Sequence, residues 1–186
     1  VGALVLGLGM FILSESSGRP GLLSALWSGL FSAVSVLSTT GYVNDIQLPL
    51  PLMPALAVFA LMMIGASTGS TGGGLKLMRF TLLIGQSQRE LARLAHPHSV
   101  VRVRFGERVV PDEIMAAIWA FFVIYIFCVA LATMALGMTG LGFDQALAVA
   151  ASAVSNSGPA AGLISSVDPI ELSVNAKWVL CGAMLL

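Results

Sequence analysis

A run of small and polar residues interrupts the apolar sequence at residues 65–74, which read Gly65-Ala66-Ser67-Thr68-Gly69-Ser70-Thr71-Gly72-Gly73-Gly74. The flanking apolar segments, residues 54–64 and 75–84, are each too short to cross a bilayer, because a helical span needs about 20 residues. Together they have the length of one transmembrane helix broken in the middle. Unpaired backbone groups are not tolerated in hydrocarbon, so such a break must be buried in protein or line a water-filled cavity. The alternative is a loop between two short helices of a soluble protein.

The composition favours the membrane interpretation. Of the 186 residues, 57% are hydrophobic and 10% are charged, and the mean hydropathy is +0.94, whereas soluble domains carry about 25% charged residues. The 9 basic and 9 acidic residues cancel, so no basic surface suggests a nucleic-acid partner. We therefore expect a protein embedded in a lipid bilayer.

The basic residues are concentrated in one part of the chain. Seven of the nine lie within residues 76–108, namely Lys76, Arg79, Arg89, Arg93, Arg102, Arg104 and Arg108. Cytoplasmic loops of membrane proteins carry an excess of Lys and Arg. Residues 85–111 are therefore predicted to face the cytoplasm, and the segments around Asp45 and Asp168 to face outward.

Other segments complete the predicted topology. Residues 114–138 contain no charge and follow Pro111-Asp112-Glu113, a helix-start signal, so they form the clearest span. Residues 22–37 and 143–154 read as short re-entrant helices. Residues 1–13 and 176–186 are apolar but short, and both are expected to be clipped transmembrane helices of a longer protein.

Two segments are similar at an offset of 117 residues, which aligns Gly41 with Gly158. The first reads Ser35-Val36-Leu37-Ser38-Thr39-Thr40-Gly41 and the second Ser152-Ala153-Val154-Ser155-Asn156-Ser157-Gly158, with three of seven positions identical. Chance similarity among small residues is the alternative, but the flanking segments follow in the same order in both copies. Transport folds commonly contain such repeats and place their site at the repeat interface.

The tip of the first re-entrant segment has the parts of a cation filter. It reads Thr39-Thr40-Gly41-Tyr42, and in such filters backbone carbonyls replace the hydration shell of the ion. Glycine allows the backbone to turn without a side-chain clash. The second copy, Asn156-Ser157-Gly158-Pro159, departs from this pattern.

Six motifs, spread over nearly the whole chain, together resemble the Trk/Ktr/HKT superfamily of potassium transporters, in particular its TrkH branch. They are Ser38-Thr39-Thr40-Gly41-Tyr42, GASTGSTGGGLK at residues 65–76, Arg79-Phe80, Arg89-Glu90-Leu91, His96-Pro97 and Ser155-Asn156-Ser157-Gly158-Pro159. The resemblance implies an all-helical membrane fold of M1-pore helix-M2 repeats with re-entrant pore loops. Residues 1–84 would then be the third repeat, residues 85–111 a cytoplasmic linker, and residues 112–186 the fourth repeat.

The resemblance also assigns site residues. It implies that potassium is bound in the filter, at the residues Thr39, Thr40, Gly41, Asn156, Ser157 and Gly158. The alternative is that these groups only cap the two pore helices. It further implies a mobile gate beneath the filter, formed by Gly65, Ser67, Thr68, Gly69, Ser70, Thr71, Gly72, Gly73 and Gly74.

The function implied by the resemblance is potassium translocation across a bacterial plasma membrane by a multi-pass protein, with potassium as substrate and no cofactor. A homodimer and a cytosolic nucleotide-binding partner of the TrkA type are implied as well. Three alternatives remain: a sodium-permeable transporter of the same superfamily, a membrane assembly subunit that transports nothing, and an intramembrane enzyme. The enzyme lacks a candidate catalytic group, because the predicted spans contain no His, Asp or Glu.

Three further features receive simpler interpretations. The spacing of Gly69 and Gly74 is that of a phosphate-binding P-loop, but Leu75 separates Gly74 from Lys76 and no Ser or Thr follows. Lys76 and Arg79 are expected to act as interfacial anchors, although tuning of cation passage or docking of a partner is an alternative. His96 and His98 have no acid or cysteine nearby in sequence and do not predict a metal site.

Overall fold

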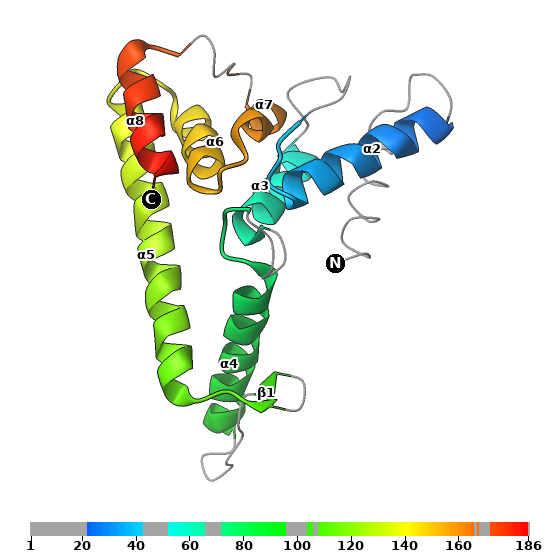
Figure 1. Ribbon diagram of the computed structural model, residues 1–186, viewed down its shortest axis with the longest axis vertical. Helices are drawn as coiled ribbons and strands as arrows, with labels where there is room; N and C mark the ends of the chain where they lie inside the picture. Colours follow the sequence, from blue (N-terminus) through cyan, green and yellow to red (C-terminus); the bar gives the residue numbers. More distant parts are fainter. Residues whose placement is uncertain are drawn as a thin grey trace.

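The computed structural model describes residues 22–42, 52–65, 72–95, 104–105, 108–165, 167 and 172–185. Within these residues the fold is helical, as predicted (Figure 1). The elements are α2 (Leu22–Leu37), α3 (Leu52–Ile64), α4 (Leu77–Ala95), α5 (Asp112–Gly137), α6 (Phe143–Val154), the 3₁₀ turn η1 (Gly158–Ala160), α7 (Ala161–Ile164) and α8 (Val174–Met184). A two-residue antiparallel pair, β1 (Arg104–Phe105) with β2 (Arg108–Val109), precedes α5 and was not predicted.

Helix α5 is the longest element and runs along the whole height of the molecule (Figure 1). Its upper half packs against α6 and α8, and its lower half lies beside α4. Helix α5 is also the one described helix that is long and apolar enough to cross a membrane, over Glu113–Gly137. Its outward side chains are apolar, and Val123, Ile124 and Phe127 are each 60% exposed. An apolar surface of this kind is typical of lipid or protein contact, not of water.

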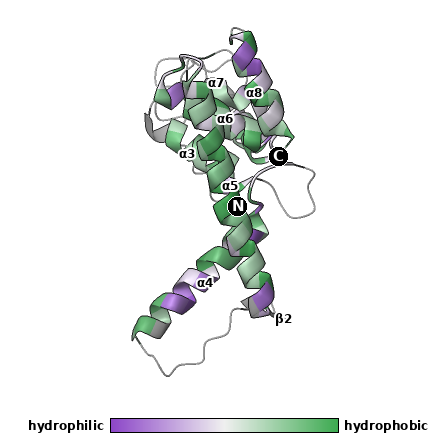
Figure 2. Cartoon of the chain, turned by 90° about the vertical axis from the view of Figure 1, so that its left-hand side faces the viewer, coloured by the Kyte–Doolittle hydropathy of each residue, from purple (hydrophilic) through white to green (hydrophobic). Residues whose placement is uncertain are grey.

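The break between α3 and α4 falls where the glycine-rich stretch predicted it. Helix α3 ends at Ile64, and α4 begins at Leu77 below it (Figure 1). Helix α4 then continues to Ala95, well beyond the predicted end of the apolar segment at residue 84. The extension mixes hydrophilic with apolar residues (Figure 2) and is rich in helix-forming residues. The Gln86 Nε2 donates to the Glu90 Oε1 one turn later at 2.8 Å.

Three apolar cores hold the helices together. The first joins α2, α3, α5, α6 and α7 around buried residues such as Val36, Met62 and Leu163. The second lies between α5, α6 and α8. The third, between α4 and α5, contains Leu82, Leu83, Met115 and Ile118. The two short helices α2 and α6 therefore end within the first core region, close to the break in the α3–α4 pair.

Candidate functional site

The chain turns sharply after α2 through a residue in the left-handed region. Thr39 has φ +57°, and the N–H of Thr40 donates to the carbonyl of Ser35 at 3.0 Å while the N–H of Thr39 donates to the carbonyl of Val36 at 3.0 Å. This is the Schellman arrangement, which normally places Gly or Asn at the left-handed position. A β-branched threonine there is an outlier, and such strained residues concentrate at functional sites.

The turn after α6 repeats this geometry at the offset of 117 residues. Asn156 has φ +58°, the N–H of Ser157 donates to the carbonyl of Ser152 at 2.8 Å, and the N–H of Asn156 donates to the carbonyl of Ala153 at 3.0 Å. Helices α2 and α6 also end at equivalent residues, Leu37 and Val154. The weak sequence repeat therefore corresponds to one repeated backbone turn.

The hydroxyl groups of the two turns match as well. The Ser38 Oγ donates to the carbonyl of Ser35 at 3.1 Å and lies 2.9 Å from the Thr40 Oγ1. In the second turn the Ser155 Oγ lies 2.9 Å from the Ser157 Oγ and 3.4 Å from the carbonyl oxygen of Ser152. Its shortest hydrogen bond differs from that of Ser38, because it donates to the carbonyl of Ala151 at 2.7 Å. Each turn is thus braced by a hydroxyl pair two residues apart.

The two turns meet at Gly41. A Cβ atom at Gly41 would overlap the carbonyl oxygen of Ser157 and would lie 3.1 Å from the Cδ of Pro159. Gly41 also has φ +78°, a conformation that L side chains rarely adopt. Its equivalent, Gly158, has φ +31° but open space around the Cβ position. Glycine is therefore required more strictly at residue 41 than at residue 158.

Three glycines close the base of the loop between α3 and α4. Gly65 and Gly74 have φ +68° and +84°, and a Cβ at Gly65 would lie 2.5 Å from the carbonyl oxygen of Gly73. The N–H of Leu75 donates to the carbonyl of Met63 at 3.1 Å, so the two ends of the break are tied together. Residues 66–71, which include the predicted gate residues Ser67, Thr68, Gly69, Ser70 and Thr71, lie outside the described residues.

The loop base also touches the second turn. A Cβ at Gly73 would overlap the carbonyl oxygen of Ser155 and lie 3.2 Å from its Cα. The second turn therefore lies between two other backbone segments. Gly41 contacts it at Ser157, and Gly73 contacts it at Ser155. Ser155 and Ser157 have no exposed surface, which leaves this contact dry and tightly packed.

The electrostatic potential at the two turns arises from helix dipoles and not from charged side chains. Residues 35–42 and 152–160 contain no Asp, Glu, Lys, Arg or His. Helices α2 and α6 both direct their C-terminal ends at these turns, and a helix C-terminus carries a partial negative charge of about half an elementary charge. The site is therefore suited to a cation that is held by carbonyl oxygens, with no fixed carboxylate.

The carbonyl groups of the two turns differ in whether they already accept a hydrogen bond. Among the described residues, no hydrogen-bond donor is bound to the carbonyls of Thr39, Thr40, Gly41 or Asn156. In contrast, the carbonyl of Ser157 accepts from the N–H of Ala160 at 3.1 Å, and that of Gly158 accepts from the capping N–H of Ala161. A carbonyl oxygen has two lone pairs, so these two can still contact an ion. Counting only donors among the described residues, the first turn has more carbonyls that accept no hydrogen bond.

Sequence reasoning placed the predicted filter residues in two turns that the structure brings together, but it missed three features. It did not foresee η1 and α7, which follow the second turn and are signalled only by Pro159 at the start of the 3₁₀ turn. It missed the contact of Gly73 with Ser155. It also did not foresee the contact of Arg79 with Phe121, in which the Arg79 Cζ lies 4.1 Å from the centroid of the ring.

Known proteins resemble this chain over most of its length. The family described as "TrkH: Cation transport protein" matches residues 14–186. The "Trk system potassium uptake protein TrkH" of Salmonella typhimurium is 35% identical over 88% of the chain, and the protein of the same name from Halomonas elongata is 38% identical over 88%. The crystal structure of the potassium transporter TrkH from Vibrio parahaemolyticus superimposes with a TM-score of 0.86 and 30% identity over 98% of the chain.

This chain covers only part of the length of each of these relatives. The chain spans 34% of the length of the Salmonella typhimurium and Halomonas elongata proteins and 39% of the Vibrio parahaemolyticus chain. The match of the family over residues 14–186 nevertheless includes both repeated turns and the broken helix. This chain belongs to the TrkH family of cation transport proteins, which are membrane proteins.

Proposed function

We propose that this chain forms part of a potassium pathway through a bacterial plasma membrane, with the turns after α2 and α6 as two segments of its selectivity filter. One observation carries the proposal: two turns with the same hydrogen bonds meet at Gly41 and Ser157 in a member of a cation transport family. Carbonyls of Thr39, Thr40 and Gly41, with those of Asn156, Ser157 and Gly158, would replace water around potassium.

The loop from Gly65 to Gly74 is proposed as the gate. Its closed base and its contact with Ser155 support this role, because movement of the loop would be transmitted to the second filter turn. Potassium is the proposed substrate, since the relatives named above are potassium uptake proteins. We propose no cofactor and no enzymatic activity.

Transport is tested by expressing the gene that encodes this chain in a bacterial strain without its own potassium-uptake systems. Growth at low external potassium, with potassium uptake above that of the empty strain, is expected. Uptake of sodium with equal efficiency would favour the sodium-permeable alternative. A protein that reaches the inner membrane but moves neither ion would favour an assembly subunit.

Two partners are proposed from the family resemblance: a second copy of the protein, and a cytosolic nucleotide-binding protein of the TrkA type. Support for the cytosolic partner comes from sequence, since seven of the nine basic residues lie within residues 76–108 and would face it. Purification of the tagged protein in mild detergent, with mass measured by light scattering and co-purifying proteins identified, tests both. A monomeric mass without any such protein would contradict this part of the proposal.

A further inference from the structure

Two buried hydroxyl groups lie side by side in the second turn. Ser155 and Ser157 both have an exposed fraction of 0%, and their Oγ atoms are 2.9 Å apart. Backbone packs on the turn from two sides, at Gly41 and at Gly73. This burial does not depend on segments outside the chain, which would only add to it. Both hydroxyls therefore need hydrogen-bond partners within the protein, since a buried polar group without a partner is costly.

The hydrogen bonds of this pair run in one direction. The Ser155 Oγ donates to the carbonyl of Ala151 at 2.7 Å, while its distance of 3.4 Å from the Ser152 carbonyl is long for a hydroxyl bond. A serine hydroxyl has a single proton to donate. The contact between the two Oγ atoms is then a bond from Ser157 to Ser155. A hydroxyl chain thus runs from Ser157 through Ser155 to Ala151, in the last turn of α6.

This hydroxyl chain spans Asn156, the residue between the two serines. Asn156 has φ +58°, and its carbonyl accepts no hydrogen bond from the described residues. Asparagine adopts both the left-handed and the right-handed region, so its own side chain does not fix the direction of this carbonyl. A bond between the side chains on either side of Asn156 opposes rotation of the peptide.

The first turn contains a second chain of the same kind. The Ser38 Oγ donates to the carbonyl of Ser35 at 3.1 Å, so the contact of 2.9 Å between the Thr40 Oγ1 and the Ser38 Oγ is a bond donated by Thr40. This chain spans Thr39, which is also in the left-handed region, at φ +57°. A hydroxyl chain across the left-handed residue is therefore common to both turns.

We propose that the hydroxyl chain of the second turn holds the Asn156 carbonyl in the orientation that binds potassium, and that Ser155 is the positioning residue on which the chain depends. The proposal rests on the filter function proposed above. Ser155 acts through its neighbours and not on the ion, because its proton is donated to Ala151 and its oxygen accepts from Ser157 in a fully buried site.

The test measures the KM and the maximal rate of potassium uptake, with membrane abundance, for two alanine variants. Ser155→Ala leaves the Ser157 hydroxyl buried without its acceptor, so the turn should leave the binding orientation. We expect the KM for potassium to rise about three- to tenfold, because the apparent affinity falls with the fraction of binding-competent protein, while the maximal rate stays near that of the wild type. Ser157→Ala should raise the KM less, since the bond from Ser155 to Ala151 remains.

The double variant Ser155→Ala with Ser157→Ala gives the sharpest comparison. It leaves no buried hydroxyl without a partner in this chain, and removing both partners of a hydrogen bond costs less than removing the acceptor alone. The KM of the double variant should therefore fall below that of Ser155→Ala and match that of Ser157→Ala. A KM above that of Ser155→Ala would overturn the proposal, because the two hydroxyls would then act independently.

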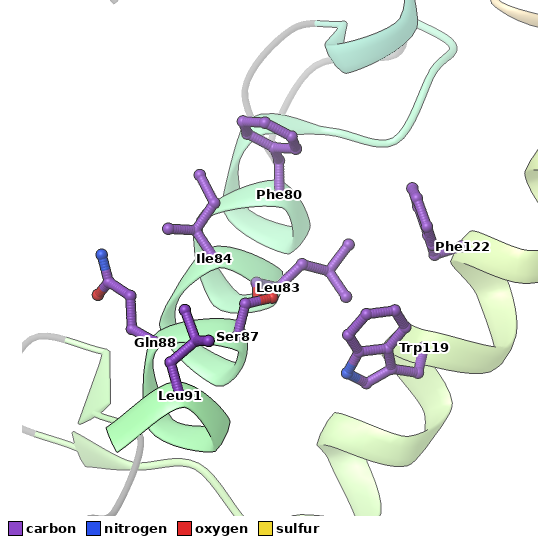
Figure 3. Close-up of a pocket in the computed structure, with 8 residues that line it drawn as sticks. All are labelled: Phe80, Leu83, Ile84, Ser87, Gln88, Leu91, Trp119 and Phe122. Atoms are coloured by element: carbon purple, nitrogen blue, oxygen red, sulfur yellow. The ribbon is translucent and has the colours of Figure 1, made fainter. Parts of the chain in front are cut away.

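Two other serines provide matched controls. Ser165 is also buried, follows α7, and donates from its Oγ to the carbonyl four residues earlier at 3.3 Å. The Ser87 Oγ donates in the same way at 2.9 Å, on α4 beside a pocket of about 260 Å³ that α4 and α5 line (Figure 3). Ser165→Ala and Ser87→Ala should keep the wild-type KM. A rise in either control equal to that of Ser155→Ala would overturn the positioning role.

Potassium binding to the purified protein gives a readout that does not depend on transport. A bound ion raises the Tm, and the potassium concentration that gives half of this rise should increase in Ser155→Ala by the same factor as the KM. A wild-type protein that takes up no potassium would overturn the proposed function. Intact wild-type uptake, with an unchanged KM and an unchanged half-point in Ser155→Ala, would overturn the positioning role alone.

Discussion

At the scale of single residues, the two glycines proposed for the filter, Gly41 and Gly158, differ in what surrounds them. A side chain at Gly41 meets the carbonyl of Ser157 and must also adopt φ +78°, whereas a side chain at Gly158 enters open space at φ +31°. We therefore expect Gly41→Ser to weaken the discrimination of potassium over sodium strongly, and Gly158→Ser to act in the same direction but less. The measurement is the dependence of uptake on the concentration of each ion.

Gly137→Ser is a suitable control for these variants, because its Cβ position is also open and it lies at the end of α5, away from the two turns. Each variant must reach the membrane at wild-type abundance. If Gly41→Ser and Gly158→Ser both keep wild-type affinity and selectivity, the two turns are not the filter.

Thr39 stores backbone strain that its counterpart Asn156 does not. Both residues occupy the left-handed region, at φ +57° and +58°, but Asn tolerates it while a β-branched residue is disfavoured, at a cost of about 1–3 kcal/mol. Thr39→Asn should therefore raise the Tm of the purified protein, and the reverse change, Asn156→Thr, should lower it. A lower Tm for Thr39→Asn would show that the Thr39 hydroxyl, which donates to the carbonyl of Ser38 at 2.7 Å, outweighs the strain.

At the scale of elements, the loop between α3 and α4 is expected to control flux more than selectivity. It contacts the second turn through Gly73, and it is not one of the segments proposed to form the filter. Deleting three residues within residues 67–71 should raise conductance and leave the potassium-to-sodium ratio unchanged. Unchanged flux, together with an unchanged response to a cytosolic partner, would indicate that the loop is only a packing kink.

Gly73→Ala tests the same element by a different route. The added methyl group would overlap the carbonyl of Ser155, so the loop base must move away from the second turn. We expect a changed rate of uptake, because the contact between the two segments is broken, with little change in membrane abundance. Gly182→Ala, where the Cβ position is open in α8, is the control, and equal uptake in the two variants would contradict the coupling.

Much of the element structure could be predicted because it depends on local pattern. The apolar segments at residues 22–37 and 143–154 end at Ser, Thr, Asn and Gly, and the observed α2 and α6 have the same bounds. The end of α4 could not be predicted in the same way, because beyond residue 84 its sequence is mostly polar and begins with Gly85, which weakens a helix signal, although no proline occurs before Pro97. Hydropathy detects only the part of a helix that is apolar.

The contacts between distant elements were beyond sequence reasoning. Nothing in the residues around Gly73 indicates that this glycine, among five in the stretch, is the one that meets Ser155. Likewise, a hydropathy pattern cannot distinguish Phe121, which contacts Arg79, from Phe127, which is exposed on the same helix. Such pairs depend on how helices rotate and cross, which the periodicity of a single helix does not specify.

At the scale of the whole molecule, charge and hydropathy divide the structure along its length. The described helices around the two turns are mostly apolar, while the second half of α4 carries hydrophilic residues among apolar ones (Figure 2). Since Lys and Arg accumulate on the cytoplasmic side of membrane proteins, this end of α4 and the segment that follows it are expected inside the cell. In that orientation the two turns are expected to lie at membrane depth, with α2 and α6 entering from the outer side.

Cysteine labelling in intact cells tests this orientation. The native Cys128 and Cys181 are free, so both are first replaced, Cys128→Ala and Cys181→Ser, and potassium uptake is checked. A cysteine at Arg93, in the last turns of α4, should resist a membrane-impermeant reagent applied outside and react after the cells are opened, because the positive-inside rule predicts that the basic end of α4 faces the cytoplasm. A cysteine at Asp168, within the segment predicted to face outward, should react in intact cells. Modification of the Arg93→Cys variant from outside would contradict the topology, and with it the assignment of α2 and α6 as helices that enter the membrane from the outer face.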